Sequence, residues 1–239
     1  LGHSPVSAAK TTHRRATAKR AAALALTAAL VVGMTLPAFA DVYDLTKGDI
    51  SVGFKNNQQT VTQEDGNGGY VKNKNNEDII DLPDNDVVIT TKDAETSEVK
   101  TTDNTVTVNS NEGETVNVTL DNVNIDTSRA AVSVTGSGNT NIELNGNNTL
   151  TSGGWHAGLE HNKETDSEGN ETSGTLTITD TDKNGSLTAT GGYGSGGAGI
   201  GGENTKNAGK IEITGGTITA VGTEDGAGIG GGGGGGGIG

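Results

Sequence analysis

The sequence of 239 residues contains no cysteine and very few aromatic residues. Without cysteine, no disulfide braces the fold, so a hydrophobic core or bound ions must hold a secreted chain together. One Trp, three Tyr and two Phe are too few for a conventional globular core. The apolar residues are mostly Val, Ile and Leu, which favour strands. The absence of cysteine excludes a disulfide scaffold, and the predominance of Val, Ile and Leu among the apolar residues favours an all-β fold.

Basic residues are also scarce beyond residue 40. Five of the 16 Lys and Arg lie in residues 1–40, whereas all 30 Asp and Glu lie after them. Residues 41–239 therefore carry a formal charge of −19. A phosphate-binding surface needs a basic footprint, so this charge argues against nucleic acid and against anionic lipid as partners.

The basic residues that remain precede an apolar stretch. Residues 21–40 read AAALALTAALVVGMTLPAFA and end in an A-x-A pattern. A basic region, an apolar stretch and a small-residue end predict a secretory signal peptide over residues 1–40. A membrane anchor is the alternative, because about 20 apolar residues can span a bilayer. Cleavage after Ala40 would leave a secreted chain, located outside the cell or at its surface, with no stable membrane insertion.

Three short apolar signatures recur in a fixed order along the rest of the chain, and such repeats indicate one structural unit used several times. The first alternates two apolar residues: Val118/Leu120, Ile142/Leu144, Leu176/Ile178 and Ile211/Ile213. The second has an apolar residue between polar ones: Ile125, Leu150, Leu187 and Ile218. The third has an aliphatic residue two after a small one: Val132, Leu159, Ile200 and Ile229, at steps of 27, 41 and 29 residues.

Three short strands per repeat predict a parallel β-helix, or β-solenoid, whose equivalent residues stack from coil to coil. An antiparallel sandwich is the alternative, but it gives no reason for the repeated order. We assign residues 87–229 to the β-helix and expect residues 41–86 to form an irregular N-terminal cap. Residues 162–173 are expected to be an exposed loop, and residues 230–239 a truncated, poorly ordered, Gly-rich tail.

The third signature is embedded in glycine, as GGAGIGG over residues 196–202. If this stretch is a strand, Ala198 and Ile200 point to the core, and Gly199 and Gly201 point the other way. Ala227 and Ile229 repeat the pattern. We therefore expect a core strand whose outer face is almost bare.

Together, the stretches IELNGNNTLTSGGWHAGLE, GTLTITDTDKNGSLTATGG and KIEITGGTITAVG, with GAGIGG twice, suggest a family. The chain resembles, over about residues 42–231, secreted bacterial surface proteins identified as carbohydrate-binding-domain-containing. YDLTKGDISV and VTLDNVNIDTS are similar to the same family. The resemblance implies a right-handed parallel β-helix, display at the cell surface and polysaccharide binding.

Trp155 and Tyr193 are the candidate sugar-binding residues. Each follows a Gly-Gly pair shortly after the second signature, so we expect both rings on successive coils about 4.8 Å apart. Sugar rings present apolar faces that pack on such aromatics. His156, Glu160 and His161 lie close to Trp155 in sequence, so we expect them to hydrogen-bond the sugar hydroxyls. Strand parity puts Trp155 on the same side as the inward Ala157. A ring that merely covers a coil corner is therefore the alternative.

Residues 180–185 read DTDKNG, which matches the start of a calcium loop. Asp180, Asp182 and Asn184 present oxygens at alternate positions, as a hard cation requires. The twelfth position, normally a bidentate Glu, is Gly191, so a plain Asp/Asn/Gly turn is the alternative. No cofactor other than a structural calcium ion is expected.

Enzymatic activity has little support in the sequence. A pectate-lyase-like enzyme needs a basic residue near carboxylate-held calcium, and the only Arg beyond residue 40 is Arg129, near Asp121 and Asp126. A glycosidase needs two carboxylates at a set separation, and no spacing here demands one. We predict a non-catalytic module that binds an extracellular polysaccharide such as cellulose or pectin. The alternatives are a structural stalk or adhesin repeat that binds no sugar and, with less support, a polysaccharide lyase.

Overall fold

The computed structural model of the chain describes residues 41–194 and 196–234. These residues form an all-β structure with parallel sheets, as the sequence predicts at that level. The predicted signal peptide at residues 1–40 lies outside the described residues. So do residues 235–239 of the predicted tail.

The described residues contain nineteen short elements, and all but one of these are strands. The first sheet has the order β1(Val42–Asp44), β5(Val87–Thr90), β7(Thr115–Asp121), β10(Asn139–Asn145), β13(Thr175–Thr179), β16(Lys210–Ile213). The second has the order β17(Thr217–Val221), β14(Ser186–Thr190), β11(Asn147–Thr151), β8(Asn124–Asp126). The third has the order β18(Ile229–Gly230), β15(Ile200–Gly201), β12(Leu159–Glu160), β9(Val132–Thr135), β6(Val106–Asn109), β2(Ile50–Lys55), β3(Gln58–Gln63), β4(Leu82–Pro83). A 3-10 turn, η1(Leu45–Lys47), follows β1.

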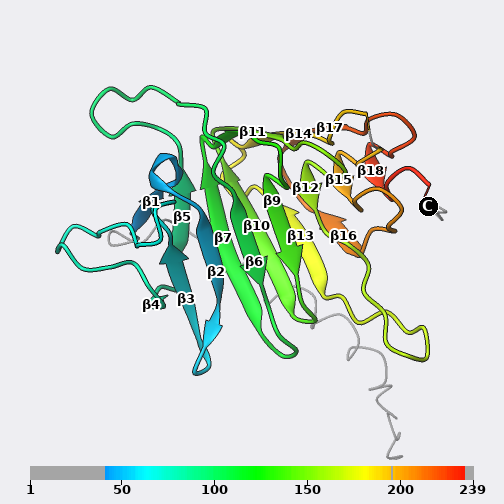
Figure 1. Ribbon diagram of the computed structural model, residues 1–239, viewed down its shortest axis with the longest axis horizontal. Coiled ribbons are helices and arrows are strands. Elements are labelled where there is room, and N and C mark those ends of the chain that lie inside the picture. Colours follow the sequence, from blue (N-terminus) through cyan, green and yellow to red (C-terminus); the bar gives the residue numbers. More distant parts are fainter. Residues whose placement is uncertain (1–40, 195, 235–239) are drawn as a thin grey trace, which may run out of the picture. The chain divides into compact units, whose positions relative to one another are not determined.

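From β7 onward the chain visits the three sheets in a fixed rotation (Figure 1). We call one passage through the first, second and third sheets a round. The rounds are β7–β8–β9, β10–β11–β12, β13–β14–β15 and β16–β17–β18. Each strand pairs in parallel with the same strand of the neighbouring round, so residues one round apart in sequence lie side by side.

The hydrophobic core is built from the inward faces of all three sheets. Ile142, Leu150 and Leu159 come from the three strands of one round, and all three are fully buried. In β13 and β14 buried and partly exposed residues alternate along the strand. This alternation follows from the period of two of a β-strand.

The third signature has the register that the sequence predicts. Val132, Leu159, Ile200 and Ile229 are paired in succession. In the other two sheets the register shifts by two residues at one step: Ile178 pairs with Ile142, and Leu187 pairs with Asn148, where Leu150 was expected. A shift of two keeps the same side chains inward, because sidedness has the same period.

The Gly-rich strand differs from the expectation on its outer face. Ala198 and Ile200 are fully buried, as predicted. Gly199, however, is also buried, and a Cβ at this position would meet the backbone of Val221 and Gly228. The glycine therefore permits close backbone packing and does not leave a bare outer wall. Ile229, expected inside, is 50% exposed, because β18 has a partner strand on one side only within the described part of the chain.

Residues 41–86 are more regular than the sequence predicts. Strands β1 and β2 pair in parallel with β5 and β6, so this segment extends the first and third sheets. Strand β3 then pairs antiparallel with β2 and with β4. The expectation of an irregular segment is thus wrong for these strands, whereas its role as a cap stays a prediction.

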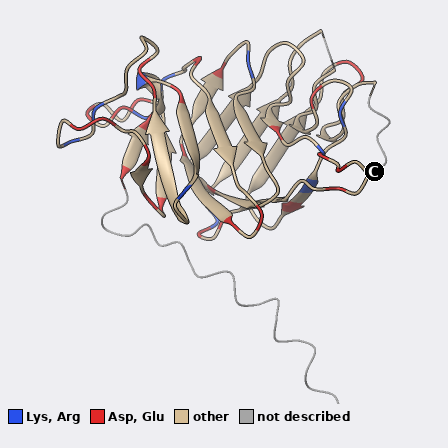
Figure 2. Cartoon of the chain, turned by 60° about the horizontal axis from the view of Figure 1, so that its bottom comes forward, with Lys and Arg blue, Asp and Glu red and all other residues tan. Residues whose placement is uncertain are grey.

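Charged residues gather in the loops and at strand ends (Figure 2). The loop at residues 162–173 is largely exposed, as expected, and a bridge between Thr165 and Glu171 holds it together. Between their ends the strands carry few charged residues (Figure 2).

Among the described residues, no helix is long and apolar enough to cross a membrane.

Candidate functional site

The two candidate aromatics lie on neighbouring loops that connect the second sheet to the third. Trp155 is on the loop from β11 to β12, and Tyr193 is on the loop from β14 to β15. The loops touch through their backbones, since the N–H of Gly192 donates to the carbonyl of His156 at 2.9 Å. The structure therefore places the two loops on adjacent rounds, as the sequence predicts.

Both rings face solvent. Trp155 is 68% exposed and Tyr193 is 89% exposed, so neither fills the core. Parity would turn Trp155 inward, but this residue belongs to a turn and not to a strand. The two rings are not strictly equivalent, because Leu159 follows Leu150 by nine residues whereas Ile200 follows Ala189 by eleven.

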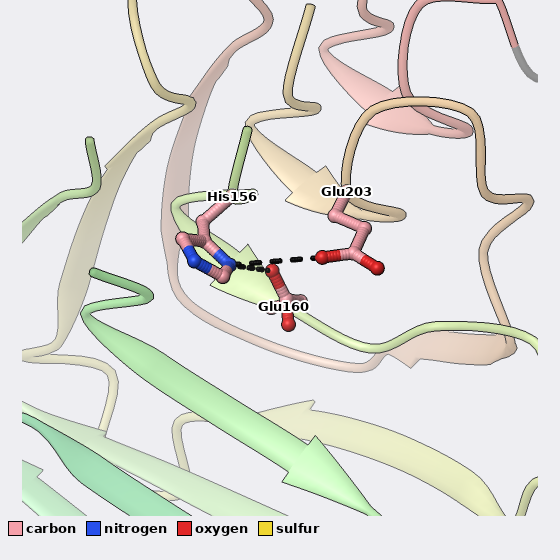
Figure 3. Close-up of side chains that lie close together, drawn as sticks. All are labelled: His156, Glu160 and Glu203. Carbon is pink, nitrogen blue, oxygen red and sulfur yellow. Dashed lines mark hydrogen bonds and ion pairs between the residues drawn. The ribbon is translucent and has the colours of Figure 1, made fainter. Parts of the chain in front are cut away.

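His156 and Glu160 form the polar part of the site (Figure 3). The Nδ1 of His156 lies 2.8 Å from Oε2 of Glu160, and the same oxygen accepts from the N–H of Ala157 at 3.3 Å. The His156 ring is partly exposed, whereas the Glu160 side chain is only 9% exposed. Glu160 is held there because it belongs to β12, next to the core residue Leu159.

A third group, Glu203, was not singled out in the sequence. Its Oε2 lies 3.8 Å from the Nδ1 of His156, so this nitrogen faces both carboxylates (Figure 3). The register of the third sheet could have identified Glu203. Glu160 pairs with Gly201, so the loop after Gly201 begins beside Glu160. Asn162 fixes this loop, because its Oδ1 accepts from the N–H of Glu203 at 2.8 Å and its amide donates to Glu160 at 3.4 Å.

The electrostatics of this cluster depend on its burial. Desolvation raises the pKa of the Glu160 carboxyl, and the nearby Glu203 charge adds to the rise, although the bond to His156 opposes it. A buried carboxylate beside a second carboxylate is costly unless a positive group compensates both. The site thus favours a cation near Oε2 of Glu160.

His161, a predicted sugar contact, is instead part of the core. It is 2% exposed, and its Nδ1 and Nε2 lie 3.1 Å and 3.0 Å from the carbonyl oxygens of Val134 and Gly174. A ring N–H therefore donates to a buried backbone carbonyl, and the side chain is held between β9 and the segment before β13. The prediction that His161 contacts sugar is wrong, since the side chain cannot reach a ligand at the surface.

Asp180, Asp182 and Asn184 lie together in the turn between β13 and β14, as predicted. Both carboxylates accept from the N–H of Asn184, at 3.1 Å and 3.3 Å. Glu143 also approaches this turn and accepts from the N–H of Thr181 at 2.6 Å. These bonds account for the turn as an Asp/Asn turn, so calcium binding stays a sequence-based prediction.

Arg129, the one candidate base of a lyase, is bound elsewhere. Its guanidinium donates to both oxygens of Asp49, at 2.7 Å and 2.9 Å, and to the carbonyl of Asp103 at 3.1 Å. Partial burial acts to raise the pKa of the Asp49 carboxyl, but hydrogen bonds from Arg129 and Thr105 outweigh it and hold this pKa below its usual value. Arg129 thus ties the segment after η1 to the loop after β8.

Replacing Asp49 by Asn is expected to lower the free energy of unfolding by roughly 1 kcal/mol at pH 7, because a bidentate but partly exposed pair is lost. A carboxyl whose pKa is lowered on folding stabilises the fold above its unfolded pKa of about 3.9. That contribution disappears as the pH falls through the folded pKa. Urea unfolding should therefore show a constant difference between wild type and Asp49→Asn at pH 5–7, shrinking below about pH 4.

Arg129→Lys is the matched variant for this pair, because lysine keeps the charge and removes the planar fork. It should show most of the same loss at pH 7. A difference between wild type and Asp49→Asn that persists undiminished at pH 2 would contradict the assignment.

Comparisons with protein-family models, with curated proteins and with solved structures find no match to this chain.

Proposed function

We propose that this chain is a secreted, non-catalytic polysaccharide-binding module at the cell surface, built as a right-handed parallel β-helix. Support for the β-helix comes from the fixed rotation of the chain through three parallel sheets. Parallel strands joined by crossovers are almost always connected in the right-handed sense. The three short strands of each round would then form one coil.

The observation that carries the binding proposal is the exposure of Trp155 and Tyr193 on touching loops. These two side chains are the most exposed large hydrophobic groups in the described part of the chain. Largely exposed aromatic rings are suited to the apolar faces of sugar rings. His156, partly exposed beside Trp155, supplies a polar group for a hydroxyl.

The charge of the chain narrows the class of glycan. Residues 41–239 carry a formal charge of −19, which repels a polyuronate such as pectin. We therefore favour an uncharged polysaccharide, such as cellulose or xylan. Binding to pectin at high salt only would agree with this reasoning, since salt screens the repulsion.

Retention of the purified full chain on insoluble cellulose, xylan and pectin tests the proposal. Each of Trp155→Ala and Tyr193→Ala is expected to weaken binding to the preferred glycan roughly tenfold, because one stacking surface is removed. Tyr70→Ala is the matched control, since this half-buried ring lies in the N-terminal segment. It should leave retention unchanged.

Two results would contradict the proposal. Equal retention of wild type and the Trp155→Ala, Tyr193→Ala double variant would exclude the aromatic site. No retention on any glycan would favour the alternative, a structural stalk or adhesin repeat. Calcium-dependent release of unsaturated products from pectate would show a lyase. The ion pair between the Arg129 guanidinium and Asp49 argues against this activity, because it occupies the side chain that would serve as the base.

A further inference from the structure

The cluster of His156, Glu160 and Glu203 combines an imidazole with two carboxylates, a combination that sugar binding beside Trp155 and Tyr193 does not require. One imidazole nitrogen and two carboxylate oxygens lie within 4.8 Å of one another, each from a different side chain. They come from three separate segments: the loop before β12, β12 itself and the loop after β15. Two successive rounds of the chain thus meet at one point (Figure 3).

We propose that His156, Glu160 and Glu203 form a binding site for a divalent transition-metal ion, with zinc as the best match. Zinc takes imidazole nitrogen and carboxylate oxygen as ligands, and three protein ligands plus one water complete a tetrahedron. Calcium and magnesium prefer oxygen alone, so the imidazole favours zinc over both of them.

The distances suit one small ion. Two ligand atoms on a tetrahedral zinc are about 3.3 Å apart, given bonds of about 2.0–2.1 Å. The Nδ1 of His156 lies 2.8 Å from Oε2 of Glu160 and 3.8 Å from Oε2 of Glu203, so the two separations bracket that value. Changes of about half an ångström would bring both of these separations to the tetrahedral value, and all three ligand atoms already lie within 4.8 Å of one another.

The surroundings hold the ligands in place. Glu160 is anchored in β12, and the side chain of Asn162 bonds both its carboxylate and the backbone of Glu203. Such outer contacts orient metal ligands and strengthen binding. The opposed carboxylates also gain from a divalent ion, which neutralises both of them at a site where burial already raises the pKa of Glu160.

Isothermal titration calorimetry of the untagged full chain with zinc chloride at pH 7 tests the proposal. One zinc ion per chain is expected to bind in this cluster. His156→Ala and Glu203→Gln should each weaken this binding at least tenfold, because one of three ligands is lost. His3 and His13 are common to all variants, so the comparison with wild type isolates the cluster.

Glu212→Gln is the matched control for Glu203→Gln, since it removes the same charge from an exposed strand residue outside the cluster. It should leave zinc binding unchanged. Far-UV circular dichroism checks that each variant is folded, and the rise of the melting temperature with zinc gives an independent reading. At the same zinc concentration, that rise should be clearly smaller in Glu203→Gln than in wild type.

The proposal is overturned if wild type takes up no zinc, or if His156→Ala and Glu203→Gln bind it as wild type does. Displacement of zinc by an equal concentration of calcium would overturn the choice of ion. Glycan retention by the metal-free chain is measured separately. Failure of the zinc site and failure of sugar binding are therefore distinguishable.

Discussion

Replacing Leu150 by alanine is expected to lower the free energy of unfolding by about 3 kcal/mol. Leu150 is fully buried in β11 and pairs with Ile125 on one side and Ala189 on the other. Both neighbours belong to paired strands, so the surroundings cannot collapse far into the space that the side chain leaves. The lost burial and the remaining cavity add to the cost.

Urea denaturation followed by far-UV circular dichroism measures this effect. Thr149→Ala is the matched control, because Thr149 lies on the opposite face of the same strand and is partly exposed. The change for the control should stay within about 0.5 kcal/mol. Equal losses for the two variants would show that Leu150 does not face a packed core.

Gly158→Ala is the second large effect we expect, again about 3 kcal/mol, although it adds a methyl group and removes nothing. A Cβ at Gly158 would lie 2.5 Å from the amide nitrogen of Thr190 and 2.7 Å from the carbonyl oxygen of Gly199. Both are backbone atoms of the next round, and they cannot turn away as a side chain would. The rounds must therefore separate or the strand must shift.

Gly53→Ala is the control for this substitution. A Cβ at Gly53 would meet only the carbonyl oxygen of Asn109, at 3.3 Å, so the change should be less than about 1 kcal/mol. The same urea experiment compares the two variants. A Gly158→Ala protein as stable as wild type would disprove the close backbone approach between rounds.

The sequence was sufficient to predict strands, their order and one of the three registers. The pairing of Leu159 with Ile200 follows from a motif that includes a small residue and glycines at fixed positions. The pairing of Leu187 with Asn148 did not follow, because a strand that slips by two residues presents the same inward face. Asn148 also reads as a polar turn residue in the sequence, whereas it is buried and bonds the backbone of Val123.

The candidate site was predictable only in part. Trp155, His156 and Glu160 are neighbours in sequence, so their proximity required no fold. Glu203 joins them only because the loop after β15 stacks on β12, and the length of the intervening loops hides this relation. The prediction for His161 was wrong because a histidine beside polar residues is expected to be exposed. Nothing in the sequence indicates the two backbone carbonyls that its ring contacts.

The pairing of each strand with the same strand of the adjacent round has a consequence for elongation. Within the described residues, no strand pairing in the four rounds skips a round, so we expect stability there to be a sum of local contributions and of interfaces between neighbours. Such a chain can grow or shrink by whole rounds while every remaining strand keeps a partner of the same kind. Duplication of a segment of one round's length would therefore lengthen the protein without a new fold.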